Sequence, residues 1–474
     1  MMKKKSISIV IVILVLLGGA MSPSTAQADT PPAGPIYIVQ QGDTLWSIAL
    51  RFNVSVSDLE TVNNLPDTNI FAGEHLVIPG LEGLSGTLTS EPVPYGQTLN
   101  SLARQYGIDE LLLRQLNHIV SPAELYAGYN LTLLQQDNQP TYTARASLAK
   151  GETLLELAVA QNTDPWTLAQ INHLPGTWGG LPNDTLVLPT ASTNNPNGLP
   201  PVITTASVDP LPIMQGTTVQ VKVTSSQPIS LAGSLVNRPL HFYPSGVNTY
   251  VALQGVDAEA VLGLFPLDLE ATLSDGSVQS FDQMVPITSG NYLHDTTIYN
   301  VAPNTIDPNL IGPQAKQVSA LTAPSSSDKY WQGQFTSPAS LFAAYTHITS
   351  PFGIRRSYIS AGTNLTLETY HSGIDYAGGI GQPITAPAAG VVVFAGPLVV
   401  CGNATYIYHG WGVYSGICHQ STIKVTVGQQ VQQGDLIGLV GSTGRITGPN
   451  LHWEVWVNGV TVNPVQWLNE TFPH

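Results

Sequence analysis

The chain has 474 residues, only 10% of them charged, and a formal net charge of −15. An acidic surface repels phosphate backbones, and the only cluster of basic residues is a run of three lysines near the N-terminus, which argues against nucleic-acid binding. A chain of this length is expected to form several domains rather than one large core. Its 44 glycines and 36 prolines are typical of β-rich modules joined by turns.

Residues 1–28 are predicted to be a secretory signal peptide. Lys3, Lys4 and Lys5 form a basic start, residues 7–21 are mostly apolar, and Ala26-Gln27-Ala28 provides an A-x-A cleavage site. The apolar run is shorter than the ~20 residues that span a bilayer, so cleavage is favoured over retention as an anchor. Loss of the three lysines would leave an exported protein with a net charge of about −18 and no transmembrane segment.

Three copies of one pattern follow, with a period near 50 residues, at 36–80, 88–135 and 141–190. The first contains Tyr37-Ile-Val-Gln-Gln-Gly-Asp-Thr-Leu-Trp-Ser-Ile-Ala49, and the others begin at Val93-Pro-Tyr-Gly-Gln-Thr-Leu99 and Leu148-Ala-Lys-Gly-Glu-Thr-Leu154. Repetition at this period indicates one supersecondary unit per copy. Alternating residues, a turn with a capping side chain and a short strand ended by proline predict the order strand, helix, helix, strand.

This pattern resembles the LysM module, a small α+β (βααβ) binder of N-acetylglucosamine-containing glycans such as peptidoglycan. The first copy matches almost throughout, the third matches well, and the second is degenerate. The resemblance implies a shallow sugar groove in the first copy, formed by Gly42, Asp43, Thr44, Asn64 and Leu65. Asp43 has a second interpretation as a helix cap. The degenerate copies could also act as spacers.

Residues 191–201 are predicted to be a linker, because Asn, Pro and Gly dominate them. Residues 202–290 contain short alternating runs, such as 218–224, 247–252, 267–273 and 278–287, which predict a β-sandwich-like domain. Residues 291–348 are interpreted as a connecting region with one short helix at 308–321. Trp331, Phe335 and Phe342 are expected to attach this region to the last domain.

The last domain, residues 349–474, carries the chemistry. It contains His371-Ser-Gly-Ile-Asp375, a downstream His419, and Asn450-Leu-His-Trp-Glu454. Two histidines and a carboxylate are a common ligand set for catalytic zinc. In an extended strand, His371 and Asp375 would lie ~13 Å apart, so the chain must turn at Ser372-Gly373 if both bind one ion. Residues 450–457 alternate as a strand with one buried face, which predicts that Asn450, His452 and Glu454 share the other face.

These motifs, with Gly444-Arg-Ile-Thr-Gly-Pro-Asn-Leu-His-Trp-Glu-Val455, resemble the lysostaphin-type zinc metallopeptidases, which cut peptide bonds in peptidoglycan. The resemblance implies a mainly antiparallel β-sheet, Zn²⁺ on His371, Asp375 and His452, and assistance from His419. Where that family has His-x-His, this chain has Asn450-Leu451-His452. Asn450 is therefore expected to occupy the place of a catalytic histidine, and it could still direct an N–H at the oxyanion.

Cys401 and Cys418 are the only cysteines, and they flank a predicted hairpin. Export to an oxidising compartment favours a structural disulfide over a nucleophilic Cys418. Residues 424–441 are predicted to form a further hairpin. Arg355, before the metal motif, has two interpretations, a contact to substrate carboxylates or a surface residue.

The sequence thus predicts a secreted, cell-wall-associated or periplasmic zinc metalloendopeptidase. Its expected partners are the glycan strands and the stem or bridge peptides of peptidoglycan. General acid or base assistance contributes about 10²- to 10⁴-fold, so loss of one of two histidines should weaken the enzyme rather than abolish it. The alternative is a non-catalytic peptidoglycan-binding or hydrolase-activating protein with a degenerate peptidase domain, which Asn450 favours.

Overall fold

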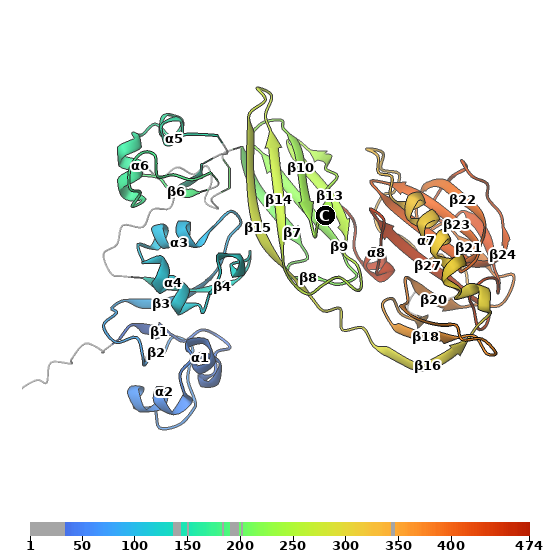
Figure 1. The fold of residues 1–474 in the computed structure, drawn as a ribbon, viewed down its shortest axis with the longest axis horizontal. Coiled ribbons are helices and arrows are strands. Elements are labelled where there is room, and N and C mark those ends of the chain that lie inside the picture. Colours follow the sequence, from blue (N-terminus) through green and yellow to red (C-terminus); the bar gives the residue numbers. More distant parts are fainter. Residues whose placement is uncertain are drawn as a thin grey trace, which may run out of the picture. The chain divides into compact units, whose positions relative to one another are not determined.

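The computed structural model describes residues 34–135, 144–148, 151–182, 184–189, 199–200, 202–342 and 347–474. The predicted signal peptide and most of the predicted linker lie outside these residues. The chain forms two compact units, one ending at Thr87 and one beginning at Leu88 (Figure 1). In the part of the chain that the structure describes, no helix has both the length and the apolar character needed to cross a bilayer.

The first two repeat copies have the predicted order of elements. The first contains β1 (Ile36–Ile38), α1 (Leu45–Phe52), α2 (Val56–Asn63) and β2 (His75–Val77), with β1 and β2 antiparallel. The second contains β3 (Thr87–Pro92), α3 (Leu99–Tyr106), α4 (Glu110–Leu116), the 3₁₀ helix η1 (Pro122–Glu124) and β4 (Asn130–Gln135). Helices α1 and α3 both begin with a capping box, Thr44 with Ser47 and Thr98 with Ser101.

The third copy has the same order, with β5 (Arg145–Ser147), α5 (Leu154–Ala160), α6 (Pro165–Ile171) and β6 (Thr185–Val187). Its core contains Leu154, Leu157, Leu168 and Leu186. These residues recur on one face of each helix and inside the short strand, which is why the copy can bury a core of its own.

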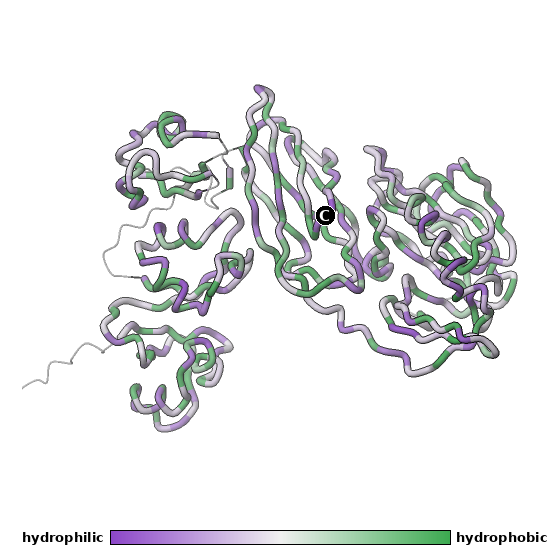
Figure 2. Tube along the Cα trace, viewed as in Figure 1, coloured by the Kyte–Doolittle hydropathy of each residue, from purple (hydrophilic) through white to green (hydrophobic). Residues whose placement is uncertain are grey.

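Residues 203–288 fold into two mainly antiparallel sheets that share one core, as the short alternating runs predict. Hydrophobic and hydrophilic residues alternate along their long strands (Figure 2). The strands are β7 (Ile203–Asp209), β8 (Ile213–Met214), β9 (Thr218–Ser225), β10 (Ser230–Leu235), β11 (Arg238–Pro239), β12 (Tyr243–Gly246), β13 (Thr249–Gly255), β14 (Gly263–Thr272) and β15 (Val278–Thr288). One sheet has the order β11-β10-β14-β15-β8, in which β8 joins β15 in parallel, and the other has the order β12-β13-β9-β7.

The connecting region contains more regular structure than the one short helix predicted for it. It contains β16 (His294–Asn300), η2 (Pro303–Thr305) and α7 (Pro308–Thr322), the last at the predicted position. Strand β16 pairs in parallel with β18 (Arg355–Ile359), which pairs with β19 (Thr366–Tyr370). Trp331 and Phe335 are buried in the core of the last domain and Phe342 packs against it, so the predicted attachment is confirmed.

The last domain is built on a ten-stranded sheet whose main order is β17-β20-β27-β24-β23-β22-β25. Its strand pairs within the described residues are antiparallel. Its elements are β17 (Ile348–Ser350), β20 (Ile374–Ala377), β21 (Pro383–Thr385), β22 (Gly390–Leu398), β23 (Gly402–Gly410), β24 (Val413–Ile423), β25 (Gln430–Val431), β26 (Leu436–Val440), β27 (Asn450–Val457), β28 (Val460–Val462) and the C-terminal helix α8 (Pro464–Asn469).

Two local predictions were wrong. Residues 424–441 do not form a hairpin, because β25 pairs with β22 while β26 pairs with β21 and β24. Strand β27 is buried along most of both faces, since His452 and Glu454 are only 7% and 5% exposed, against 0% for Leu451 and Trp453. A central strand of a covered sheet has no solvent-facing side, and alternation alone does not reveal what covers it.

Candidate metal centre

His371, Asp375 and His452 converge at one point. His371 directly follows β19, Asp375 lies in β20, and His452 lies opposite Asp375 on the neighbouring β27. The turn between the first two residues runs through Ser372 and Gly373, where a β-carbon on Gly373 would come within 2.2 Å of the Trp453 carbonyl oxygen. Glycine at this position therefore lets the turn pack against β27.

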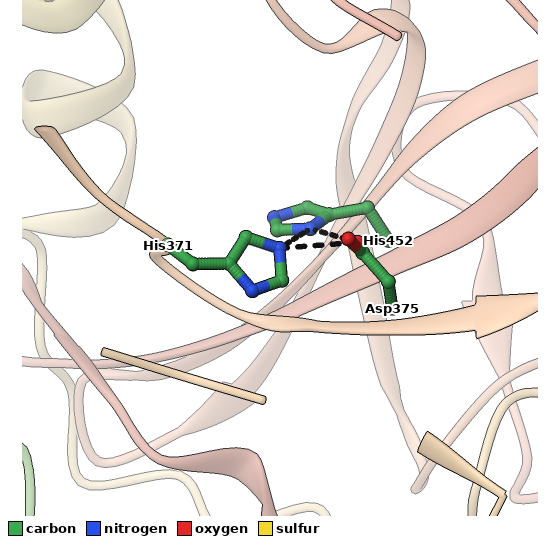
Figure 3. A group of neighbouring side chains, drawn as sticks. All are labelled: His371, Asp375 and His452. Carbon is green, nitrogen blue, oxygen red and sulfur yellow. Dashed lines mark hydrogen bonds and ion pairs between the residues drawn. The ribbon is translucent and has the colours of Figure 1, made fainter. Parts of the chain in front are cut away.

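The facing atoms of these three side chains form a small triangle. The His371 Nε2 atom lies 3.1 Å from Asp375 Oδ1 and 3.0 Å from His452 Nδ1, and His452 Nδ1 lies 2.9 Å from Asp375 Oδ1 (Figure 3). Ligand atoms ~2.0 Å from a tetrahedral zinc ion are about 3.3 Å apart, so the triangle is close to the size that such an ion requires. All three residues are 6–7% exposed.

The outer nitrogens of both histidines have acceptors. His371 Nδ1 donates to the carbonyl oxygen of Pro351 at 2.8 Å, and His452 Nε2 faces Glu454 Oε1 at 3.4 Å. This arrangement points the lone pairs of the inner nitrogens into the triangle, as in metal-binding histidines. Two such lone pairs 3.0 Å apart repel each other unless a proton or a cation lies near them. The donor set therefore fits a divalent metal ion.

The electrostatics of the triangle agree with this arrangement. Burial lowers the pKa of His371. Burial also opposes protonation of His452, but hydrogen bonds to Asp375 and Glu454 raise its pKa to about 9. Burial raises the pKa of Asp375, yet the adjacent His371 and His452 rings hold it well below its ordinary value. The carboxylates of Asp375 and Glu454 thus favour positive charge at His452.

Glu454 lies at the centre of a second layer around the triangle. Its carboxylate accepts hydrogen bonds from the Ser372 hydroxyl at 2.5 Å, the Tyr406 hydroxyl at 3.2 Å and the Trp456 indole at 2.9 Å. Burial raises its pKa, but the hydrogen bond with His452 contributes most to a net lowering. A charged Glu454 orients the His452 ring.

His419 lies beside the triangle. Its ring centroid is 5.8 Å from that of His452, and its Nδ1 donates to the Thr443 carbonyl oxygen at 2.7 Å, which leaves Nε2 as an acceptor. Burial is the main cause that lowers the pKa of His419, to about 4, so the ring is neutral at pH 7. The residue has a positive φ of 64°, which breaks the alternation of β24 next to Cys418.

Asn450 begins β27 and lines the same cleft. Its Oδ1 is buried and has no hydrogen-bond partner among the described residues. The cleft is also lined by Arg356 and Arg445, by Tyr358 of β18, and by Tyr299 and Val301 of the connecting region. Sequence reasoning did not assign these residues to the site, although alternation along β18 implies that one of Arg355 and Arg356 faces it.

Arg355 is a surface residue, the second of its two interpretations. Its guanidinium pairs with Glu259 at 3.1 Å, and both side chains are about half exposed. Arg356 is the arginine at the site, where it donates to Asp375 Oδ2 at 3.1 Å. It thereby holds the carboxylate oxygen that faces away from the triangle.

A disulfide joins Cys401, which directly precedes β23, to Cys418 of β24. The Cys401 carbonyl accepts a hydrogen bond from the His419 backbone N–H at 2.7 Å. The bridge therefore lies next to the residue whose ring faces the triangle.

The predicted sugar-groove residues lie in the first unit. Thr44 caps α1 and Asn64 ends α2 in the left-handed conformation. The interpretation of Asp43 as a helix cap is wrong, because its carboxylate instead accepts from the Tyr37 hydroxyl at 2.6 Å and the Gln40 N–H at 2.8 Å. Gly42 is exposed in a turn with φ of 91°.

Two protein families match separate parts of the chain. Residues 369–464 match the model of Peptidase family M23. The chain carries a C-terminal M23 peptidase domain. Residues 37–79 and 93–133 match the LysM domain model, so the chain also carries LysM domains. The third copy at 141–190 remains a prediction, supported by its order of elements.

Two curated proteins and one solved structure are similar to part of this chain. The DD-carboxypeptidase/endopeptidase Mpg of Neisseria meningitidis serogroup B is 46% identical over 123 residues, which are 26% of this chain and 27% of Mpg. The peptidoglycan DD-endopeptidase ShyA of Vibrio cholerae is 43% identical over 96 residues, 20% of this chain and 22% of ShyA. The chain therefore spans about a quarter of the length of the curated relatives it matches. The lysostaphin catalytic domain from Staphylococcus simulans is 32% identical, with 21% of this chain and 80% of that domain covered and a TM-score of 0.21.

Proposed function

We propose that this protein is an exported, zinc-dependent endopeptidase that cuts peptide bonds in peptidoglycan and is held on the cell wall by its LysM domains. The observation that carries the proposal is the convergence of His371, Asp375 and His452 beside a neutral His419. The M23 domain and the names of its relatives, DD-carboxypeptidase/endopeptidase and peptidoglycan DD-endopeptidase, support the substrate class.

His371, Asp375 and His452 would hold the zinc ion. When bound, zinc supplies Lewis acidity and lowers the pKa of a coordinated water. His419 is neutral and presents an unprotonated Nε2, so it can accept a proton from the attacking water and return it to the leaving amine. Asn450 cannot titrate in this range, but its amide can donate a hydrogen bond to a developing oxyanion.

Digestion of purified peptidoglycan tests this function. The zinc-loaded full-length protein should release fragments whose peptide cross-links are cut, as measured by mass spectrometry. His371→Ala should abolish release and lower the zinc content from about one per chain, because a ligand is lost. His241→Ala is a matched control, since His241 is exposed in the sandwich.

Asn450 favours a second candidate function, a wall-binding protein without turnover. In that case the wild-type protein would sediment with peptidoglycan and bind zinc, yet release no cut peptides. Cleavage of glycan rather than peptide bonds, or full release by His371→Ala, would contradict both functions.

A further inference from the structure

Two arginines line the cleft that contains the metal-binding triangle. They are Arg356 of β18 and Arg445, which lies in the segment before β27. The formal net charge of the chain is −15 and only 16 of its residues are Lys or Arg. A pair of guanidinium groups inside one cleft of so acidic a protein calls for a specific role.

The positive charge of Arg356 is balanced by the carboxylate of Asp375. Its guanidinium donates to Asp375 Oδ2 at 3.1 Å, to the Ser350 hydroxyl and to the Tyr358 hydroxyl at 3.4 Å. It also lies 5.8 Å from the centre of the Tyr299 ring. These contacts make Arg356 a positioning residue for the metal-ligand carboxylate.

Arg445 has no such counter-ion. Among the residues that the structure describes, no carboxylate lies within ion-pair distance of its guanidinium. The group instead stacks on the face of Tyr358, 4.5 Å from the ring centre, and the Arg445 backbone N–H donates to the Val400 carbonyl at 2.8 Å. Ring and backbone contacts together hold the guanidinium at the cleft wall.

The position of Arg445 has an energetic cost. Burial lowers the pKa of its guanidinium, which measures the loss of solvation that the cation suffers. The charge of Arg356 adds repulsion, which the charge of Glu454 partly offsets. A partly desolvated cation with unused donors is stabilised when an anion binds.

We propose that Arg445, stacked on Tyr358, forms a carboxylate-binding subsite of the cleft, and that the preferred substrate is a peptide with a free carboxylate close to the cleaved bond. The planar fork of a guanidinium matches a carboxylate through two parallel hydrogen bonds. The subsite shares its cleft with His419, the proposed proton-transfer residue, so the bound carboxylate lies near the reacting bond. This inference rests on the proposed peptidase function.

The carboxylate can come from the C-terminus of the peptide or from an acidic side chain. Three synthetic cross-linked peptides separate these sources: one with both carboxylates free, one amidated at the C-terminus and one amidated at the side chain. With the zinc-loaded full-length protein, we expect kcat/KM to fall about 10- to 10²-fold for one amidated peptide, the range for lost hydrogen bonds to a charged group.

Substitutions at the arginines test whether Arg445 causes the preference for a free carboxylate. Arg445→Gln should bring the ratio of kcat/KM for the free and amidated peptides close to one, and Arg445→Lys should give an intermediate ratio, since lysine keeps the charge but not the fork. Arg355→Gln should keep the wild-type ratio, because Arg355 pairs with Glu259 outside the cleft. Equal cleavage of all three peptides by the wild-type protein, or a preference that survives in Arg445→Gln, would overturn the subsite.

If no peptide is cleaved, the proposed function fails and the subsite is tested by binding alone. Calorimetric titration of the metal-free full-length protein with D-alanyl-D-alanine and with its C-terminal amide needs no turnover and avoids carboxylate binding to zinc. Stronger binding of the free acid to the wild type than to Arg445→Gln supports the subsite. Equal binding of acid and amide refutes it.

Discussion

Asn450 is the residue at which this site departs from the motif that it resembles. Its side chain lines the cleft at the start of β27, and its Oδ1 accepts no hydrogen bond within the part of the chain that the structure describes. We expect Asn450→His to raise peptidoglycan cleavage about 10- to 10³-fold, because an imidazole adds a proton-transferring group next to His452. Activity assays with parallel zinc analysis measure this gain, and His419→Ala should remove most of it. Unchanged cleavage at unchanged zinc content would mean that Asn450 is suited to the mechanism as it stands.

His409 predicts a pH dependence of stability outside the metal centre. It is fully buried, its Nδ1 donates to the Ala389 carbonyl at 2.8 Å, and its Nε2 accepts from the Ser415 hydroxyl at 2.9 Å. Burial lowers the pKa of His409 to about 4, whereas an unfolded histidine titrates near ~6.5. The unfolded state therefore binds the proton first, and stability falls as pH drops from about 6.5 towards 4.

The contribution of His409 between pH 7 and pH 5 should be about 2 kcal/mol of unfolding free energy. Chemical unfolding at both pH values measures it. His409→Gln should be less stable at pH 7 but lose less on acidification, while the exposed His241→Gln should lose as much as the wild type. If His409→Gln loses as much unfolding free energy between pH 7 and pH 5 as the wild type, another group causes the pH dependence.

At the scale of elements, the two matched LysM domains differ in the turn before their first helix. In the first, Gly42 and Thr44 are exposed. In the second, the Gly96 N–H donates to Gln283 of β15 at 3.0 Å and the Tyr95 hydroxyl accepts from the Val208 N–H at 3.1 Å. The turn of the second domain is therefore used for packing against the sandwich.

We expect only the first of these two turns to bind glycan. Thr44→Ala should weaken binding to peptidoglycan, measured by co-sedimentation, about 5- to 10-fold, which corresponds to the loss of one hydrogen bond. Thr98→Ala removes the equivalent helix cap from the second domain and should leave binding unchanged. An equal loss in both variants would mean that helix stability rather than sugar contact determines the affinity.

At the scale of the molecule, the M23 domain shares its core with neighbouring segments. Val251 and Leu253 of β13 belong to the same buried cluster as Trp331, Phe335 and Trp467. Hydrogen bonds reinforce this contact, from the Asn463 N–H to the Gly216 carbonyl at 2.7 Å and from the Trp467 indole to the Thr218 hydroxyl at 2.9 Å. The predicted peptidase segment is thus only part of a larger folding unit.

A fragment of residues 349–474 should accordingly fold poorly, whereas residues 202–474 should form a stable monomer. The shorter fragment exposes the apolar residues that face β13. It also lacks the buried Trp331 and Phe335, and truncation of a buried aromatic side chain lowers the free energy of unfolding by about 3–5 kcal/mol. Thermal unfolding and size-exclusion chromatography compare the two fragments. Equal melting temperatures would show that the shared core contributes little.

The sequence by itself determined the features that depend on local pattern. Repeats of strand, helix, helix and strand follow from periodicity and capping residues, and the sandwich strands and α7 follow from alternation and helix signals. The short spacing of His371 and Asp375 around a glycine-containing turn also implied that both could face one point. The strand containing His452 was identified by its alternation.

Only the tertiary structure decided which distant segments meet. The pairing of β20 with β27 places His452 opposite Asp375, a contact between residues 77 positions apart. The connecting region supplies Tyr299 and Val301 to the cleft, and a parallel pairing of β16 with β18 brings them there. Long-range packing also decides which of two adjacent arginines faces the triangle of His371, Asp375 and His452. It likewise decides that a third arginine has no counter-ion among the residues that the structure describes. Such contacts arise from buried surfaces that no local window of sequence contains.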